Sequence, residues 1–155
     1  MSRLFARALK GQRAIGYVSA KEWQGLTLIG GLTCRGVQTL MTLDSPLDTR
    51  SFLVFLEWSL LPTLTPGTVV VLDNLSPHRS PRVKEFIEGV GCTVLYLPPY
   101  SPDYNPIEML WSKLKHFLRS LEARTTELLH DALLIALASI TPSDALGWFK
   151  HCGLS

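Results

Sequence analysis

The stretch VVVLDNLSPHRS, residues 69–80, decides the fold. Four apolar residues follow a Pro-Gly-Thr turn, which is typical of a strand buried on both faces of a parallel sheet. Asp73 ends this strand, and a polar turn then leads into a predicted helix over residues 80–90. Functional side chains of open α/β sheets gather at the carboxyl ends of parallel strands. Asp73 is therefore the first candidate site residue.

The rest of the chain surrounds this strand with a regular order of elements. Upstream, three short β-rich runs over residues 14–20, 26–32 and 37–43 predict an antiparallel meander, followed by a helix that begins near Asp48 and ends at Pro62. Downstream, residues 93–98 predict a second buried strand, and further helices are predicted over residues 106–122, 126–139 and 142–151, the last capped by Thr141. The helix over residues 80–90 is expected to bury Val83, Phe86, Ile87 and Val90. This order predicts a single α/β domain.

Composition excludes several protein classes. With 155 residues, 46% of them hydrophobic, the chain can bury an ordinary core. Its longest apolar run, residues 132–140, is far shorter than the roughly 20 residues of a membrane span. The N-terminus lacks the apolar core of a signal peptide, so a cytoplasmic protein without a membrane partner is expected. Three cysteines without a CxxC pair favour reduced thiols over disulfides or zinc.

The basic residues are unevenly distributed although the net charge is only +2. One cluster lies within residues 1–21, and two more surround the predicted helices after Asp73. Clusters of this kind are compatible with a DNA backbone along the protein surface, and equally with ordinary solvated faces. The candidate DNA-binding residues are Arg79, Arg82, Lys113, Lys115 and Arg119.

A second candidate acid follows the Pro-rich stretch LPPYSPDYNPIEMLW, residues 97–111. Asn105 and Pro106 predict a helix start, and Glu108 at the third helical position can complete a capping box that only stabilises the helix. Helical geometry also places Glu108 on a polar face with Lys115 and Arg119, separate from the apolar stripe. Both interpretations of Glu108, cap and ligand, remain open at this point.

The residues around Asp73 allow the same two interpretations. Asp73 can form an Asx-type turn, while Asn74 and His78 can be ordinary turn residues. Alternatively, Asp73 and Glu108 follow neighbouring parallel strands and can share hard cations, since Mg²⁺ prefers a few carboxylates plus phosphate oxygens. Two such ions can support phosphodiester cleavage. Metal-assisted phosphoryl transfer is therefore the leading hypothesis from the residues alone.

The segments VVVLDNLSPHRS and LYLPPYSPDYNPIEMLWSKLK resemble the DDE-superfamily transposases, most closely the bacterial insertion-sequence relatives of the mariner elements. The 34 residues between Asp73 and Glu108 match the spacing of that branch's second and third acids, and the resemblance covers nearly the whole chain. It implies a ribonuclease-H-like fold, a mixed sheet flanked by helices. It also implies that Asp73 and Glu108 hold two Mg²⁺ or Mn²⁺ ions, with Asn74, His78 and Asn105 in support.

The resemblance further implies cleavage at transposon ends, strand transfer into target DNA, and work as a homo-oligomer. The chain departs from the family pattern at its start, where the first strand with the first catalytic aspartate and the N-terminal DNA-recognition domain have no counterpart. Of the acids before Asp73, Asp44 comes nearest as a strand-ending substitute. We therefore expect the C-terminal portion of a transposase catalytic domain, over residues 1–155, that is inactive alone. The alternatives are a non-catalytic DNA-binding remnant and a generic ribonuclease-H-like nuclease.

Overall fold

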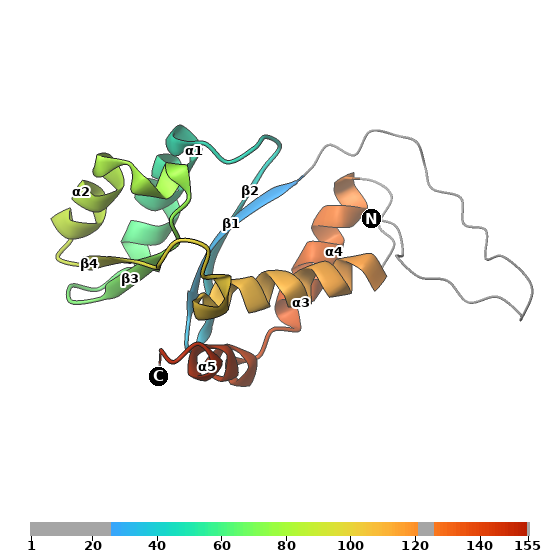
Figure 1. Cartoon of the computed structure of the whole chain (residues 1–155). Coiled ribbons are helices and arrows are strands. Elements are labelled where there is room, and N and C mark those ends of the chain that lie inside the picture. Colours follow the sequence, from blue (N-terminus) through green and yellow to red (C-terminus); the bar gives the residue numbers. More distant parts are fainter. Residues whose placement is uncertain (1–25, 121–125, 155) are drawn as a thin grey trace, which may run out of the picture. The chain divides into compact units, whose positions relative to one another are not determined.

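The computed structural model describes residues 26–120 and 126–154 of the chain (Figure 1). These residues divide into two compact parts. The first part contains residues 26–109 and 140–154, and with them all four described strands. The second part contains the described residues between 110 and 139.

The first part begins with a hairpin, as the sequence predicts. Strands β1 (Thr27–Thr33) and β2 (Gly36–Leu43) pair antiparallel around the turn Cys34–Arg35. Gly36 has φ 133°, a backbone conformation that favours glycine, and its carbonyl accepts a hydrogen bond from the hydroxyl of Thr33. The first predicted strand of the meander, residues 14–20, lies outside the described residues.

The strand that ends at Asp73 pairs with the predicted second strand. Strands β3 (Val69–Leu72) and β4 (Thr93–Tyr96) pair in parallel through the crossover helix α2 (Pro81–Gly89). The predicted burial on both faces is wrong, because Val69 is 55% and Leu95 49% exposed. Among the described residues β3 and β4 form a two-stranded sheet of their own, and the side chains of β4 alternate between exposed and half-buried.

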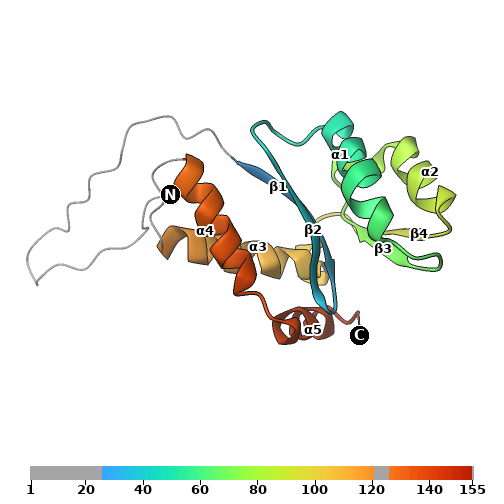
Figure 2. The same cartoon turned by 180° about the vertical axis from the view of Figure 1, so that it is seen from behind.

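The core of the first part lies between the helices and the two sheets. Helix α1 (Thr49–Phe55) begins at Asp48, whose side chain forms a capping box with Ser51. It continues as a π-helix over Leu56–Leu60 and a 3₁₀ turn over Leu61–Thr63, so the chain stays helical one residue beyond Pro62. The π-helix lies beside α2 (Figure 2). The buried core side chains are Ile29, Phe52, Phe55, Leu56, Leu60, Val83, Ile87 and Cys92.

The remaining helices follow the prediction closely. Helix α5 (Pro142–His151) opens with a Thr141 capping box and packs against β2 within the first part. Helix α3 (Pro106–Ser120) begins in the first part and continues into the second, which also contains α4 (Thr126–Ala138). Leu110, Leu114 and Leu118 are buried along the apolar face of α3. Val90 was expected in the core but is exposed, because α2 ends at Gly89 and the following turn carries Val90 outward.

No single helix within residues 26–120 and 126–154 is long and apolar enough to cross a membrane; α4 and α5 satisfy length and composition only as a bent pair.

Candidate active site

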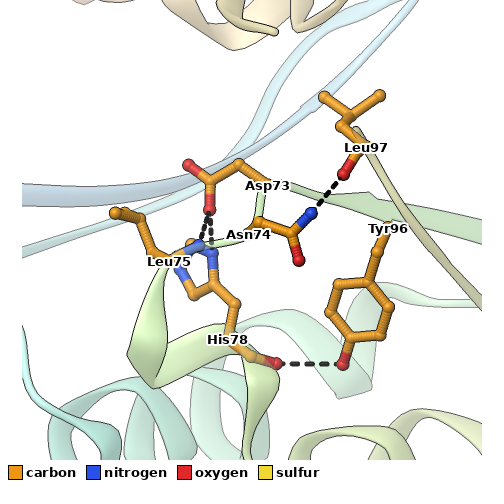
Figure 3. A network of polar contacts seen from close by, with 6 residues as sticks. All are labelled: Asp73, Asn74, Leu75, His78, Tyr96 and Leu97. Atoms are coloured by element: carbon orange, nitrogen blue, oxygen red, sulfur yellow. Dashed lines mark hydrogen bonds and ion pairs between the residues drawn. The ribbon is translucent and has the colours of Figure 1, made fainter. Parts of the chain in front are cut away.

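Asp73 stands at the carboxyl end of β3, where the chain turns into a 3₁₀ helix over Ser76–Arg79. One oxygen of its carboxylate, Oδ1, accepts hydrogen bonds from the backbone N–H of Leu75 at 3.1 Å and from Nδ1 of His78 at 2.5 Å (Figure 3). The first contact is the predicted Asx-type turn. The second shows that His78 is more than a turn residue. In the part of the chain that the structure describes, Oδ2 has no hydrogen-bond partner.

His78 is held from three sides. Its ring packs against Phe52 of α1 with the ring centroids 4.1 Å apart, and its side chain is only 13% exposed. Its backbone carbonyl accepts a hydrogen bond of 3.0 Å from the hydroxyl of Tyr96, the last residue of β4. An ionised carboxylate can only accept, so Nδ1–H of His78 is the donor to Asp73. These contacts fix the direction from which His78 approaches Asp73.

Asn74 connects the Asp73 turn to the end of the neighbouring strand β4 by a hydrogen bond. Its Nδ2 donates to the backbone carbonyl of Leu97 at 2.6 Å, across the carboxyl ends of β3 and β4 (Figure 3). The backbone N–H of Leu97 in turn donates to the carbonyl of Leu72 at 2.8 Å. The turn that carries Asp73 is therefore fastened to the strand that leads toward Glu108.

The electrostatics of the site favour an ionised Asp73. Burial raises the pKa of Asp73, but the hydrogen bonds from His78 and the Leu75 N–H outweigh burial and hold that pKa below its ordinary value. Tyr96 behaves differently. Burial raises the pKa of its hydroxyl, against the opposing positive charge of Arg79, so Tyr96 stays a neutral donor to His78.

Glu108 occupies the first turn of α3, and the structure decides against the capping-box interpretation. The backbone N–H of Asn105, which a capping box would direct to Glu108, donates instead to the carbonyl of Pro102 at 2.9 Å. Asn105 still caps the helix weakly, because its Oδ1 accepts from the N–H of Ile107 at 3.4 Å. The Glu108 carboxylate is exposed and has no hydrogen-bond partner among the described residues.

The Pro-rich approach to Glu108 is ordered by backbone geometry. A 3₁₀ turn over Pro102–Tyr104 precedes α3, and Pro106 is buried at the first helical position. Tyr100 has φ 57°, the left-handed conformation that few residues other than glycine adopt. Prolines that fix φ restrict the freedom with which Glu108 is presented.

The predicted DNA-binding residues fall into different environments. Arg79 is exposed beside the Asp73 turn, whereas the guanidinium of Arg82 lies 5.6 Å over the ring of Phe86. On α3, Lys115 and Arg119 are exposed on the polar face with Glu108, as predicted. Lys113 is half-buried, and its ammonium donates to the carbonyl of Ser139 at 3.4 Å.

Few side chains of the described part of the chain can serve as ligands of a divalent cation. Within residues 26–120 and 126–154, no group of three or more His, Cys, Asp or Glu side chains could hold a metal. Magnesium, however, is commonly held by one or two carboxylates together with substrate phosphates and water. Among the described residues, neither Asp73 Oδ2 nor the Glu108 carboxylate has a hydrogen-bond partner, so each can offer a carboxylate oxygen to such an ion. Asp44 is exposed after β2, and Asp48 is engaged in its helix cap.

Sequence reasoning missed two residues of this site. Phe52 lies within the predicted helix that ends at Pro62, and Tyr96 within the predicted strand over residues 93–98. The one available signal was the position of Tyr96 next to the end of β4, at the same edge of the sheet as Asp73. The contact of Phe52 with His78 depends on tertiary packing and leaves no local pattern.

The chain is similar to known proteins over most of its length. The sequence profile of the family described as DDE superfamily endonuclease matches residues 1–129. The transposase of transposable element Tcb2 from Caenorhabditis briggsae is 31% identical over 120 residues, which are 74% of this chain and 44% of that protein. The chain thus spans less than half the length of this relative.

Solved structures agree in fold. A Mos1 transposase paired-end complex with the left transposon end superposes with a TM-score of 0.81 and 18% identity, over 97% of this chain and 47% of that one. A Mos1 mariner paired-end complex with Mn gives 0.77 and 20%, over 99% of this chain and 48% of that one. These likenesses confirm the ribonuclease-H-like α/β class expected from the sequence.

Proposed function

The chain belongs to the DDE superfamily of endonucleases, and from this premise we propose that it carries part of the active site of a DNA transposase. The reaction is metal-dependent cleavage of DNA at transposon ends, followed by strand transfer into a target. The observation that carries the proposal is that Asp73 and Glu108, with 34 residues between them, each present a carboxylate oxygen that has no hydrogen-bond partner among the described residues.

Each residue has a defined task in this proposal. Asp73 offers Oδ2 to a divalent cation while Leu75 N–H and His78 hold Oδ1. Glu108 offers the second carboxylate, on a segment whose prolines limit its motion. Arg79, Arg82, Lys115 and Arg119 bind backbone phosphates. Mg²⁺ or Mn²⁺, as two ions, would supply Lewis-acid stabilisation of the attacking and leaving oxygens.

Two carboxylates are fewer than the family pattern requires. We propose that cleavage needs a third acid in addition to Asp73 and Glu108, and that this acid is not Asp48, whose carboxylate is engaged in its helix cap. Activity would then require a complete catalytic domain, working in a homo-oligomer on transposon-end and target DNA. The Mos1 complexes, which contain transposon ends, support DNA as the partner.

The first test is metal binding, followed by nicking. Mn²⁺ binding measured by electron paramagnetic resonance is expected in the chain and is expected to weaken in Asp73→Asn and Glu108→Gln. Glu85→Gln, an exposed glutamate of α2, is the matched control and should bind as the parent does. Binding that is identical in all four proteins would overturn the proposal. Nicking of a plasmid and strand transfer into it are then assayed with Mg²⁺ and with Mn²⁺.

A second candidate function has its own support. The two-carboxylate donor set and the exposed Lys115 and Arg119 also suit a DNA-binding protein without catalysis. In that case DNA binding would depend on salt but not on chelator or on Asp73→Asn. A generic nuclease would hydrolyse DNA without strand transfer, so the joined product separates it from a transposase.

A further inference from the structure

A polar pocket opens next to the Asp73 turn and has no role in the proposed metal site. Its volume is about 400 Å³, and its lining residues are Thr49, Asn74, Ser76, Arg79 and Ser80. Thr49 comes from the start of α1, and the other four come from the turn that connects β3 to α2. All of them belong to the first part of the molecule.

The lining is chemically suited to an anion. It consists of three hydroxyl groups, one amide and one guanidinium, with no carboxylate. Among the described residues, the hydroxyls of Thr49, Ser76 and Ser80 make no hydrogen bond to any other protein group. The side chain of Asn74 is held in place at the edge of the pocket, because its Nδ2 donates to the carbonyl of Leu97. Three uncommitted hydroxyls can therefore donate into the pocket.

The guanidinium of Arg79 is the positive charge of this pocket. Within residues 26–120 and 126–154 no carboxylate lies within 4 Å of it, whereas the nearby Lys84 is paired with Glu88 at 3.7 Å. Arg82 is turned to the ring of Phe86. Of the basic residues around the β3–α2 turn, Arg79 alone lines the pocket, and a planar guanidinium binds phosphate oxygens in a bidentate manner.

We propose that this pocket binds one phosphate of a DNA backbone, adjacent to the phosphate that reacts at Asp73. The inference rests on the proposed function for its choice of DNA. Asn74 lines the pocket and directly follows Asp73, so a phosphate held by Arg79 and the hydroxyls lies beside the acid in the same turn. Because His78 and Asn74 fasten that turn, the bound strand is positioned together with the Asp73 carboxylate.

The test measures binding of a fluorescent duplex oligonucleotide by anisotropy, in chelator and over a range of salt. Arg79→Gln is expected to weaken binding about tenfold and to reduce the salt slope by about one. Arg50→Gln removes the same charge one residue from Thr49 but outside the pocket, and should have a clearly smaller effect. Ser76→Ala with Ser80→Ala should weaken binding without changing the salt slope. Equal effects of Arg50→Gln and Arg79→Gln would contradict the proposal.

A methylphosphonate scan identifies the bound phosphate. One phosphate at a time is replaced with a neutral methylphosphonate. The loss of DNA-binding free energy from this replacement and the loss from Arg79→Gln should be non-additive at a single phosphate position. Additivity at every position would overturn the proposal. Inorganic phosphate that shifts the side-chain NMR signal of Arg79, without any coupled DNA position, would assign the pocket to a free anion and also overturn it. The oligonucleotide is bound in the presence of chelator, so this test does not depend on a metal ion. If Arg79 is coupled to one phosphate but the chain does not bind Mn²⁺, only the proposed catalysis is contradicted.

Discussion

His78 Nδ1 lies 2.5 Å from Asp73 Oδ1, the same carboxylate oxygen that accepts the N–H of Leu75. The contacts therefore concentrate on one oxygen and leave the other open. A carboxylate held in this way cannot rotate to exchange its two oxygens without losing both hydrogen bonds. The open oxygen is presented in one direction, which is useful to a ligand of a metal ion.

Replacing His78 should weaken metal binding although His78 is not a proposed ligand. In His78→Leu the carboxylate loses its strongest donor, and the Mn²⁺ affinity is expected to fall about 10- to 100-fold. His78→Asn places an amide N–H near the position of Nδ1 and should restore part of the affinity. Calorimetric titration with Mn²⁺ measures both. Equal losses in the two variants would indicate that the ring contact with Phe52, rather than the hydrogen bond, is what matters.

The pKa of Asp73 gives a pH dependence with a definite sign. Its folded-state pKa is lowered, so the ionised group stabilises the folded protein above the ordinary Asp pKa of about 4, and this contribution is lost as the pH falls through the lowered value. Carbon-detected NMR titration should find Asp73 below the ordinary value. In His78→Leu the pKa should be higher, because burial then acts with less opposition. A pKa that is unchanged in this variant would contradict the assignment of the shift to His78.

Two glycine substitutions should change stability in opposite directions. A Cβ at Gly31 of β1 would lie 2.9 Å from Cδ1 of the buried Leu60 and 3.2 Å from Cγ2 of Thr39. Gly31→Ala should therefore lower the free energy of unfolding by about 1–3 kcal/mol. A Cβ at Gly89, in the last turn of α2, meets nothing within 4 Å. Gly89→Ala should raise the free energy of unfolding by about 0.5–1 kcal/mol. Urea denaturation of both variants checks the pair.

The open strand edges predict self-association. Among the described residues β1 pairs only with β2 and β3 only with β4, so each sheet leaves backbone donors and acceptors at its outer edges. We expect sedimentation to show concentration-dependent oligomers and urea to unfold the chain with low cooperativity. Val69→Lys, at the exposed start of β3, should reduce association, whereas Val54→Lys on α1 should not. Cooperative unfolding of a stable monomer would count against this expectation.

Local signals in the sequence predicted most of the elements. Thr141 and Pro142 predicted the start of α5, and β-rich runs separated by a Gly-containing turn predicted both strands of the hairpin. The burial of β3 was overestimated because an apolar run does not show how many strands a sheet will have. The π-helical continuation of α1 has no simple sequence signature, and it was predicted as ordinary helix.

The candidate site was less accessible to sequence reasoning than the fold. The two acids could be chosen by position, and Asn74 and His78 by their proximity to Asp73. The choice between cap and ligand for Glu108 could not be made, because it depends on whether the N–H of Asn105 donates to Glu108 or to Pro102. The pocket beside Asp73 combines Thr49 with residues 25 or more positions away, and only the folded chain brings them together.

The hydrogen bonds that hold the Asp73 turn determine which substitutions are tolerated around it. Asn74 and Tyr96 donate to main-chain carbonyls, which every residue possesses, so the acceptor side of both contacts survives any substitution that preserves the backbone. The donor side does not. In a saturation library, position 97 should tolerate many apolar side chains, while positions 74 and 96 should be nearly invariant. In these two contacts the evolutionary constraint therefore falls on the donors Asn74 and Tyr96.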